Sequence, residues 1–147
     1  MLRSVSLFLS TFFYIGKIKY APGTFASLCL ICLWYFLVPY DYLTRLGLIF
    51  FLFLLSIICV YYSLSFFEEE DPQSIVIDEV LGMSIGLFFI KENFLLIFFA
   101  FILFRFFDIL KPSIIYYSQN LKQPYGILID DVLAGAFTAL IILPYTW

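Results

Sequence analysis

About half of the charged residues of this chain lie in four short polar segments that separate long apolar runs. Two of these segments carry adjacent carboxylates, IDEV with Asp78 and Glu79 and IDDV with Asp130 and Asp131. Carboxylate oxygens are hard ligands of the kind that Mg²⁺ prefers in proteins. Adjacent acids at a helix start also have a structural explanation, because negative charge complements the positive end of the helix dipole. Both interpretations stay open on position alone.

The third segment, FRFFDILKP, places a carboxylate between two cations. Arg105, Asp108 and Lys111 stand at spacings of three residues, so each neighbouring pair shares one face of a helix. A salt-bridged stripe beside lipid headgroups would explain this spacing. A metal or phosphate site also explains it, with Asp108 as the carboxylate and the two cations holding phosphate oxygens. Pro112 is expected to end the helix directly after the cluster.

The fourth segment, KIKYAPGTFAS, is basic and contains a turn signal. Pro22 and Gly23 predict a turn, and Thr24 is a candidate N-cap of the apolar helix that follows. Free N–H groups at a helix N-terminus suit an anion, and Lys19 stands just upstream. Thr24 and Lys19 are therefore candidate phosphate contacts. An ordinary cap, with lysines attracted to anionic lipid, predicts the same pattern.

The elements that position these residues are expected to be apolar helices in a membrane. The chain has 147 residues, of which 64% are hydrophobic and 13% charged, whereas an average soluble domain is about half apolar and about a quarter charged. One small domain cannot bury so many apolar side chains, so the remainder must face lipid. The net charge of −3 argues against a nucleic-acid partner. Histidine is absent, so proton transfer must use other groups.

Uncharged stretches predict an all-α polytopic membrane bundle with about three to four spans. The expected spans are residues 25–38, 46–67, 80–104 and 132–147. The third is interrupted by Lys91, Glu92 and Asn93, and charges near mid-membrane are costly. We therefore interpret it as a hairpin of two half-length helices with the charges at its tip. The N-terminal apolar run lacks a small-residue cleavage site, so a single domain over residues 1–147 is expected.

This hairpin brings all four polar segments to one side of the membrane. The distribution of Lys and Arg indicates that this side is cytoplasmic. Small residues Ala134, Gly135 and Ala136 follow the paired aspartates and allow close helix packing there. The acidic and basic residues are therefore expected to converge on one membrane surface.

Taken in order, the four segments resemble the phosphatidylglycerophosphatase A family. The family pattern has a Pro-Gly-Thr turn, an IDE-V-G segment, an FRxFDxxKP segment and a G-x-x-x-DDxxAG segment. This chain has APGTFASL, IVIDEVLGM, FRFFDILKP and YGILIDDVLAG, so the resemblance covers nearly the whole chain. Two departures, a missing second proline in KPSII and QPYG in place of a glycine-rich entry, affect loop shape and remove no carboxylate.

The resemblance implies a multi-pass enzyme of the bacterial inner membrane. It would convert phosphatidylglycerophosphate to phosphatidylglycerol with Mg²⁺, at an active site facing the cytoplasm. The expected Mg²⁺ ligands are the five clustered acids, Asp78, Glu79, Asp108, Asp130 and Asp131. Catalysis is assigned to Asp108, Glu79 and Asp131. The expected contacts to the substrate phosphate are Arg105, Lys111, Lys19 and Thr24.

Other classes of protein are weighed by what the chain lacks and where its acids lie. A histidine nucleophile is excluded, and no arginine stands six residues after Cys29, Cys32 or Cys59, which excludes a Cys-x5-Arg phosphatase. The alternative from another class is a non-enzymatic membrane protein, either an ion or proton pathway or an assembly subunit, since intramembrane carboxylates often serve transport. The acids here lie at the ends of apolar runs, which favours a surface-facing active site.

Overall fold

The computed structural model describes residues 2–67, 72–118 and 121–146. Over these residues the chain forms α-helices and short 3₁₀ turns and no strand, as the sequence predicts. The α-helices are α1 (Leu2–Ser10), α2 (Pro22–Leu37), α3 (Tyr42–Ser63), α4 (Ile77–Gly86), α5 (Phe94–Leu110), α6 (Ser113–Ser118) and α7 (Tyr125–Ile142).

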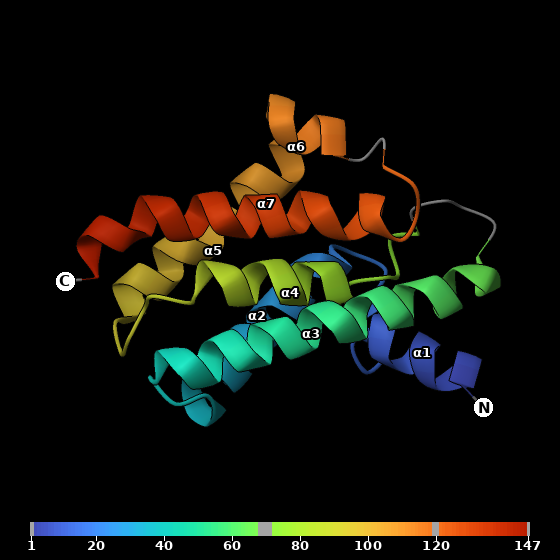
Figure 1. Ribbon diagram of the computed structural model, residues 1–147, viewed down its shortest axis with the longest axis horizontal. Helices are drawn as coiled ribbons and strands as arrows, with labels where there is room; N and C mark the ends of the chain where they lie inside the picture. Colours follow the sequence, from blue (N-terminus) through green and yellow to red (C-terminus); the bar gives the residue numbers. More distant parts are fainter. Residues whose placement is uncertain (1, 68–71, 119–120, 147) are drawn as a thin grey trace.

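The long helices lie along one axis, and successive ones run in opposite directions (Figure 1). Helix α4 is at the centre and packs against α2, α3, α5 and α7. Eight of its ten residues are buried. The short helices α1 and α6 lie outside this bundle, against α3 and α7 respectively. Because α4 contacts all four long helices, its first turn can bring side chains from several of them together.

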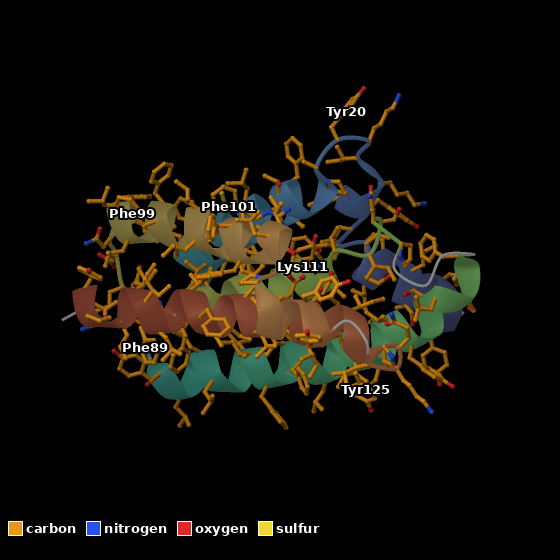
Figure 2. The ribbon with its side chains drawn as sticks, turned by 90° about the horizontal axis from the view of Figure 1, so that it is seen from above. Tyr20, Phe89, Phe99, Phe101, Lys111 and Tyr125 are labelled. Carbon is orange, nitrogen blue, oxygen red and sulfur yellow. The ribbon has the colours of Figure 1, made fainter. Side chains whose placement is uncertain are left out.

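Two elements of the described chain are long and apolar enough to cross a membrane. They are Tyr42–Phe66, which is α3 with its 3₁₀ extension, and Tyr125–Tyr145, which is α7 with its extension. Helix α2 is apolar but shorter, with 16 residues. Many apolar side chains project outward from the bundle (Figure 2), among them Leu43, which is 78% exposed on α3. This surface fits a membrane-associated protein. The last expected span ends at residue 147, which lies outside the described residues.

The expected hairpin is present, but one of its arms is longer than predicted. Helix α4 ends at Gly86 and α5 begins at Phe94, so Lys91 and Glu92 lie exposed in the connection. The ten residues of α4 make it a half-length helix of about 15 Å. Helix α5 has 17 residues and is about 26 Å long, so the prediction of two half-length helices was wrong for it. Asn93 starts α5 by accepting hydrogen bonds from two backbone N–H groups of its first turn.

The C-terminal end of α4 is held by Arg45, a fully buried residue of α3. Its Nη1 donates to the carbonyl oxygens of Leu87 at 3.3 Å, Phe88 at 2.8 Å and Ile90 at 2.6 Å. Its Nε donates to the carbonyl of Pro39 at 3.1 Å. Backbone carbonyls without partners are costly in apolar surroundings, and a cation complements the C-terminal end of a helix. Arg45 therefore stabilises the C-terminal end of the short helix α4 inside the bundle.

The predicted start of α2 was wrong. Thr24 is not its N-cap, because the helix already begins at Pro22 and the cap position is Ala21, in the left-handed region at φ 47°. Proline is favoured at the first helical position, since its fixed φ suits the helix and its missing N–H loses no hydrogen bond there. Pro22 and Gly23 thus belong to the helix and do not form the predicted turn.

Candidate active site

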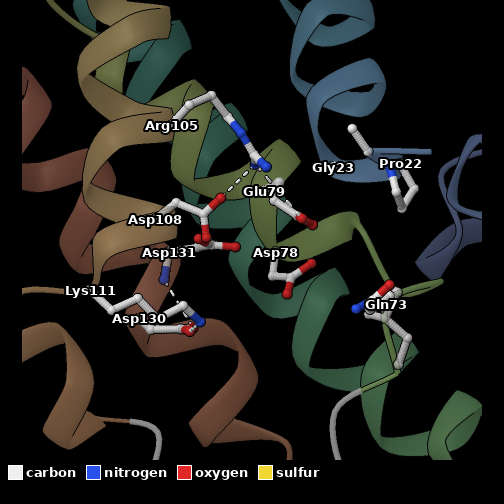
Figure 3. A pocket seen from close by; sticks show the side chains of 12 residues that line it. Pro22, Gly23, Gln73, Asp78, Glu79, Arg105, Asp108, Lys111, Asp130 and Asp131 are labelled. Atoms are coloured by element: carbon white, nitrogen blue, oxygen red, sulfur yellow. Dashed lines mark hydrogen bonds and ion pairs between the residues drawn. The ribbon is translucent and has the colours of Figure 1, made fainter.

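The four polar segments meet in one pocket at the end of the bundle where α4 begins. The pocket has a volume of about 300 Å³. Figure 3 shows charged side chains from α4, α5 and α7 pointing toward one another there, with the start of α2 nearby. The lining residues are Ala21, Pro22, Gly23, Gln73, Ile75, Asp78, Glu79, Arg105, Asp108, Lys111, Asp130 and Asp131. The convergence predicted for the acids, Arg105 and Lys111 is thus present.

Three carboxylates form the centre of the pocket. Asp78 and Glu79 come from the first turn of α4, and Asp131 comes from α7. Each offers one carboxylate oxygen, and these oxygens all lie within 4.8 Å of one another. Such close acids repel one another unless protons or a cation lie between them.

Two glycines allow α7 to bring Asp131 this close to α4. A Cβ on Gly82 would lie 2.5 Å from the carbonyl oxygen of Asp131, and a Cβ on Gly135 would overlap the carbonyl oxygen of Gly82. The two helix backbones therefore touch at this point. The predicted small-residue contact after the paired aspartates is confirmed at Gly135.

A third glycine places the start of α2 against the same carboxylates. A Cβ on Gly23 would overlap the carboxylate of Glu79 and lie 3.2 Å from Nη1 of Arg105. Sequence reasoning identified Gly23 only as part of a turn. The structure instead makes it a wall of the pocket that no larger residue could form without displacing Glu79.

The two cations of the pocket are each paired with an aspartate. Nη1 of Arg105 lies 2.5 Å from Oδ2 of Asp108 and 3.9 Å from Oε1 of Glu79. The same-face pairing of Arg105 with Asp108 is therefore confirmed. Nζ of Lys111 lies 2.6 Å from Oδ2 of Asp130. The expected same-face relation of Lys111 to Asp108 was wrong, because Lys111 lies beyond the last residue of the helix.

The change of partner at Lys111 follows from how α5 ends. The helix stops at Leu110, and Lys111 adopts the left-handed conformation with φ 43°. Pro112 has no N–H and disfavours helix at the preceding residue. Helical spacing therefore no longer applies at Lys111, and its side chain reaches α7 instead.

The aspartates of α7 lie deeper in their helix than the sequence predicts. We expected Asp130 and Asp131 to open the last helix, but α7 begins at Tyr125 and includes Gly126. Both aspartates are consequently buried more than one turn from the helix start. They are placed by packing of α7 against α4, and helix capping does not explain them.

Burial and mutual repulsion make the charged state of the α4 acids unfavourable. These two acids lie in the first turn of α4, outside the two candidate spanning helices. Burial, followed by the charge of Glu79, raises the pKa of Asp78 well above its ordinary range. Burial raises the pKa of Glu79 to about 7, with the charge of Asp108 acting in the same direction and Arg105 opposing it. Such perturbed carboxyls are typical of functional sites.

The acids at the centre of the pocket fit a divalent cation. Oδ1 of Asp78, Oε2 of Glu79 and Oδ1 of Asp131 are buried and have no hydrogen-bond partner among the described residues. Buried polar atoms normally have a partner, so atoms that lack one call for an explanation. A hard cation such as Mg²⁺ takes carboxylate oxygens as ligands and completes its shell with water and substrate oxygens.

Two expected phosphate contacts lie outside the pocket. The side chain of Lys19 is exposed, and its Nζ lies 5.7 Å from the ring centroid of Tyr20, which projects away from the bundle (Figure 2). Thr24 is half-buried in α2, and neither residue is among those that line the cavity. Conversely, Gln73 and Ile75 line the pocket without having been predicted. In the sequence, only their position shortly before Asp78 and Glu79 indicated that they lie near the site.

Comparison with known proteins agrees with the motif order. The family model described as Phosphatidylglycerophosphatase A matches residues 8–145. The chain belongs to the phosphatidylglycerophosphatase A family. The resemblance read from the four segments is therefore confirmed.

Two relatives carry the family name. A phosphatidylglycerophosphatase A of Haemophilus influenzae is 38% identical over 135 residues, covering 86% of this chain and 80% of the relative. A phosphatidylglycerophosphatase A of Escherichia coli is 31% identical over 134 residues, covering 86% and 75%. A third relative, from Bacteroides thetaiotaomicron, is named "Putative phosphatidylinositol-3-phosphatase" and is 35% identical over 147 residues, covering 95% and 92%. No solved structure matches the chain.

Membership of the phosphatidylglycerophosphatase A family makes this chain a lipid phosphatase. The prediction of an enzyme is thereby confirmed, and the non-enzymatic alternative loses its support. The family, its bacterial relatives and the two apolar spanning elements together fit a membrane-associated enzyme of phospholipid metabolism.

Proposed function

We propose that this phosphatase hydrolyses the terminal phosphate of phosphatidylglycerophosphate in a Mg²⁺-dependent reaction, at the cytoplasmic face of the bacterial inner membrane. The observation that carries the proposal is the pocket itself. Three carboxylates, of which Asp78 and Asp131 are buried and Glu79 is half-buried, each have one oxygen without a hydrogen-bond partner and lie beside Arg105 and Lys111. A dianionic phosphate and a divalent cation together complement such a set of charges.

Asp78, Glu79 and Asp131 are the residues that would hold Mg²⁺. Their oxygens converge, and the one ion pair they make among the described residues is the long 3.9 Å contact of Glu79 with Arg105, whereas Asp108 and Asp130 each have a cation within 2.6 Å. The ion would supply positive charge that stabilises the phosphoryl oxygens in the transition state. The positive charge of the ion would also offset the repulsion among the three acids. These acids would then serve as metal ligands, and another residue can be the general base.

Arg105 and Lys111 bind and orient the phosphoryl group. Arginine has five N–H donors in a planar fork, more than its contacts with Asp108 and Glu79 use. It can therefore hold Asp108 and a phosphate oxygen together. Lys111 has three donors and reaches the pocket from the end of α5. Hydrogen-bond donors that are held in place where negative charge develops stabilise the transition state more than mobile donors in water do.

Asp108 takes the proton of the attacking water. Its ion pair with Arg105 fixes the carboxylate at the pocket, where a general base must lie within hydrogen-bond reach of the proton it removes. The water oxygen forms a bond to phosphorus while the bond from phosphorus to the glycerol oxygen breaks. The glycerol oxygen takes up the proton that Asp108 received, so Asp108 is restored, one water is consumed, and phosphatidylglycerol and inorganic phosphate are released.

A lipid panel tests this assignment of substrate. The purified protein in detergent micelles is supplied with phosphatidylglycerophosphate or phosphatidylinositol 3-phosphate, the second because of the name of one relative. We expect a kcat/KM at least about tenfold higher for phosphatidylglycerophosphate, a difference of about 1.4 kcal/mol. Preference for the inositol lipid would reject the proposed substrate and retain the phosphatase.

A further inference from the structure

The pocket has a charged side and a neutral side. Figure 3 shows Arg105, Asp108 and Lys111 across the pocket from Gln73, with Pro22 and Gly23 at the start of α2. Among the described lining residues, Gln73 is the one uncharged side chain with hydrogen-bonding groups. The role proposed above for the pocket uses the charged side and leaves Gln73 without a function.

The backbone around Gln73 is fixed against the N-terminal part of the chain. The N–H of Ile75 donates to the carbonyl of Pro72 at 2.9 Å, which closes a turn around Gln73. The N–H of Val76 donates to the carbonyl of Ser10 at 2.9 Å. A Cβ on Gly16 would overlap the carbonyl oxygen of Ser74, so the two segments are in direct contact. The exposed Gln73 side chain thus extends from an anchored turn.

The charges of the pocket determine how a substrate must lie in it. Arg105 and Lys111 are the cations among the described lining residues, and both lie on the side of Asp108 and Asp130, so the donors for an anion are on that side. The phosphate must bind there, next to the carboxylates that would hold the cation. The group that carries the phosphate then extends toward Gln73. An amide side chain can both donate a hydrogen bond to a hydroxyl and accept one from it.

We propose that Gln73 is a specificity-determining residue that hydrogen-bonds the free hydroxyl of the glycerol between the two phosphates of the substrate. The assignment rests on the proposed function and identifies the part of the lipid headgroup that the enzyme recognises. A site built to pair with a substrate hydroxyl discriminates against an analogue that lacks it, because its polar group is then left unpaired.

A cycle of two enzymes and two lipids tests this contact. The lipids are phosphatidylglycerophosphate and its deoxy analogue, in which propane-1,3-diol replaces the glycerol that bears the terminal phosphate. The enzymes are the wild type and Gln73→Ala. For the wild type we expect kcat/KM about tenfold lower on the deoxy lipid. For Gln73→Ala we expect the same loss on the natural lipid and less than a twofold change on the deoxy lipid, so that the two losses do not add.

Ser74→Ala is the matched control, because Ser74 lies in the same turn and does not line the pocket. It should leave kcat/KM for both lipids unchanged. Equal losses on both lipids in Gln73→Ala would make Gln73 a support of the turn, and no loss on either would place it outside the headgroup site. Both results overturn the contact. Failure of the folded wild type to release phosphate from either lipid would instead overturn the proposed function.

Discussion

Asp78, Glu79 and Asp131 share a small buried volume in which their negative charges repel one another. Burying such groups without partners reduces stability, so their presence indicates a function that offsets the cost. Arg105 lies near this group but is engaged chiefly with Asp108, at 2.5 Å against 3.9 Å for Glu79. At the scale of residues, Asp108 and Asp130 therefore each have a close cation partner, Glu79 has a distant one, and no ion pair is present at Asp78 or Asp131 among the described residues.

Removing one of the three charges should stabilise the metal-free protein. With chelator present, we expect Asp131→Asn to raise the midpoint of thermal unfolding in detergent by about 3 °C, the effect of about 1 kcal/mol in a domain of this size. Mg²⁺ should raise the midpoint of the wild type but not that of the variant. Glu92→Gln, at the exposed tip of the hairpin, is the control and should change neither value. A lower midpoint for Asp131→Asn in chelator would contradict this account of the three acids.

Arg105 and Lys19 were both predicted to contact phosphate, but of the two only Arg105 lines the pocket. We expect Arg105→Ala to lower kcat on phosphatidylglycerophosphate by about 100-fold, the usual effect of losing a donor to a developing oxyanion. Lys19→Ala should change kcat less than about threefold, since its side chain lies outside the pocket and an exposed charge contributes little. Equal losses in the two variants, measured as steady-state phosphate release, would show that the pocket is incomplete without Lys19.

Residue types predicted the site better than residue spacing did. The carboxylates and cations that interrupt the apolar runs were expected to converge, and one pocket is lined by Asp78, Glu79, Arg105, Asp108, Lys111, Asp130 and Asp131. Helical spacing failed at Lys111, because the helix ends one residue earlier. Nothing local in the sequence marked Gln73, since its place in the pocket depends on a turn held by the distant N-terminal segment.

At the scale of elements, the site depends on how closely helices approach the first turn of α4. Contacts at Gly23, Gly82 and Gly135 bring α2 and α7 against α4 with no room for a Cβ. The short length of α4 is equally important. The helix can end inside the bundle because the carbonyl oxygens just after its C-terminal end accept hydrogen bonds from Arg45. The sequence indicated the break in this hairpin through its charged tip. The stop before Pro112 was predicted, but the apolar run that ends at Phe104 suggested a shorter helix than α5, which continues through Arg105 and Asp108.

Gly23→Ala tests the approach of α2. The added methyl group would overlap the carboxylate of Glu79, and displacement of a catalytic group by about 1 Å lowers activity by about 100-fold. We expect that loss in kcat/KM while the protein stays folded. Gly47→Ala in α3 is the control, because its Cβ would meet nothing within 4 Å. It should retain activity and gain up to about 1 kcal/mol of stability from helix propensity. Full activity of Gly23→Ala would contradict the close contact.

At the scale of the whole molecule, all the polar segments lie at one end of the bundle, and the charged tip of the hairpin lies near the other. In Figure 1 the turn between α4 and α5 and the start of α7 lie at opposite ends of the long axis. Composition predicted apolar side chains facing lipid, and the lengths of the uncharged stretches predicted an all-helical bundle. Which helices cross the membrane fully could not be read from apolar length alone, since α4 is apolar but short.

Cysteine labelling tests this arrangement in the membrane. Single cysteines are placed at exposed Lys122 and Glu92 after Cys29, Cys32 and Cys59 are replaced by serine. An impermeant thiol reagent added to intact cells should label the cysteine at position 92, and the cysteine at position 122 should react only after the cells are opened. Labelling of both positions in intact cells would reject the proposed orientation.

The central claim is that a cation held by the three acids supports hydrolysis of a lipid phosphate. Its most direct test is phosphate release from phosphatidylglycerophosphate by the purified protein in detergent micelles, with Mg²⁺ or with chelator, for the wild type and Asp131→Asn. We predict rapid release by the wild type with Mg²⁺ and a loss of at least about 100-fold with chelator or in the variant. Equal release under all four conditions would contradict the claim.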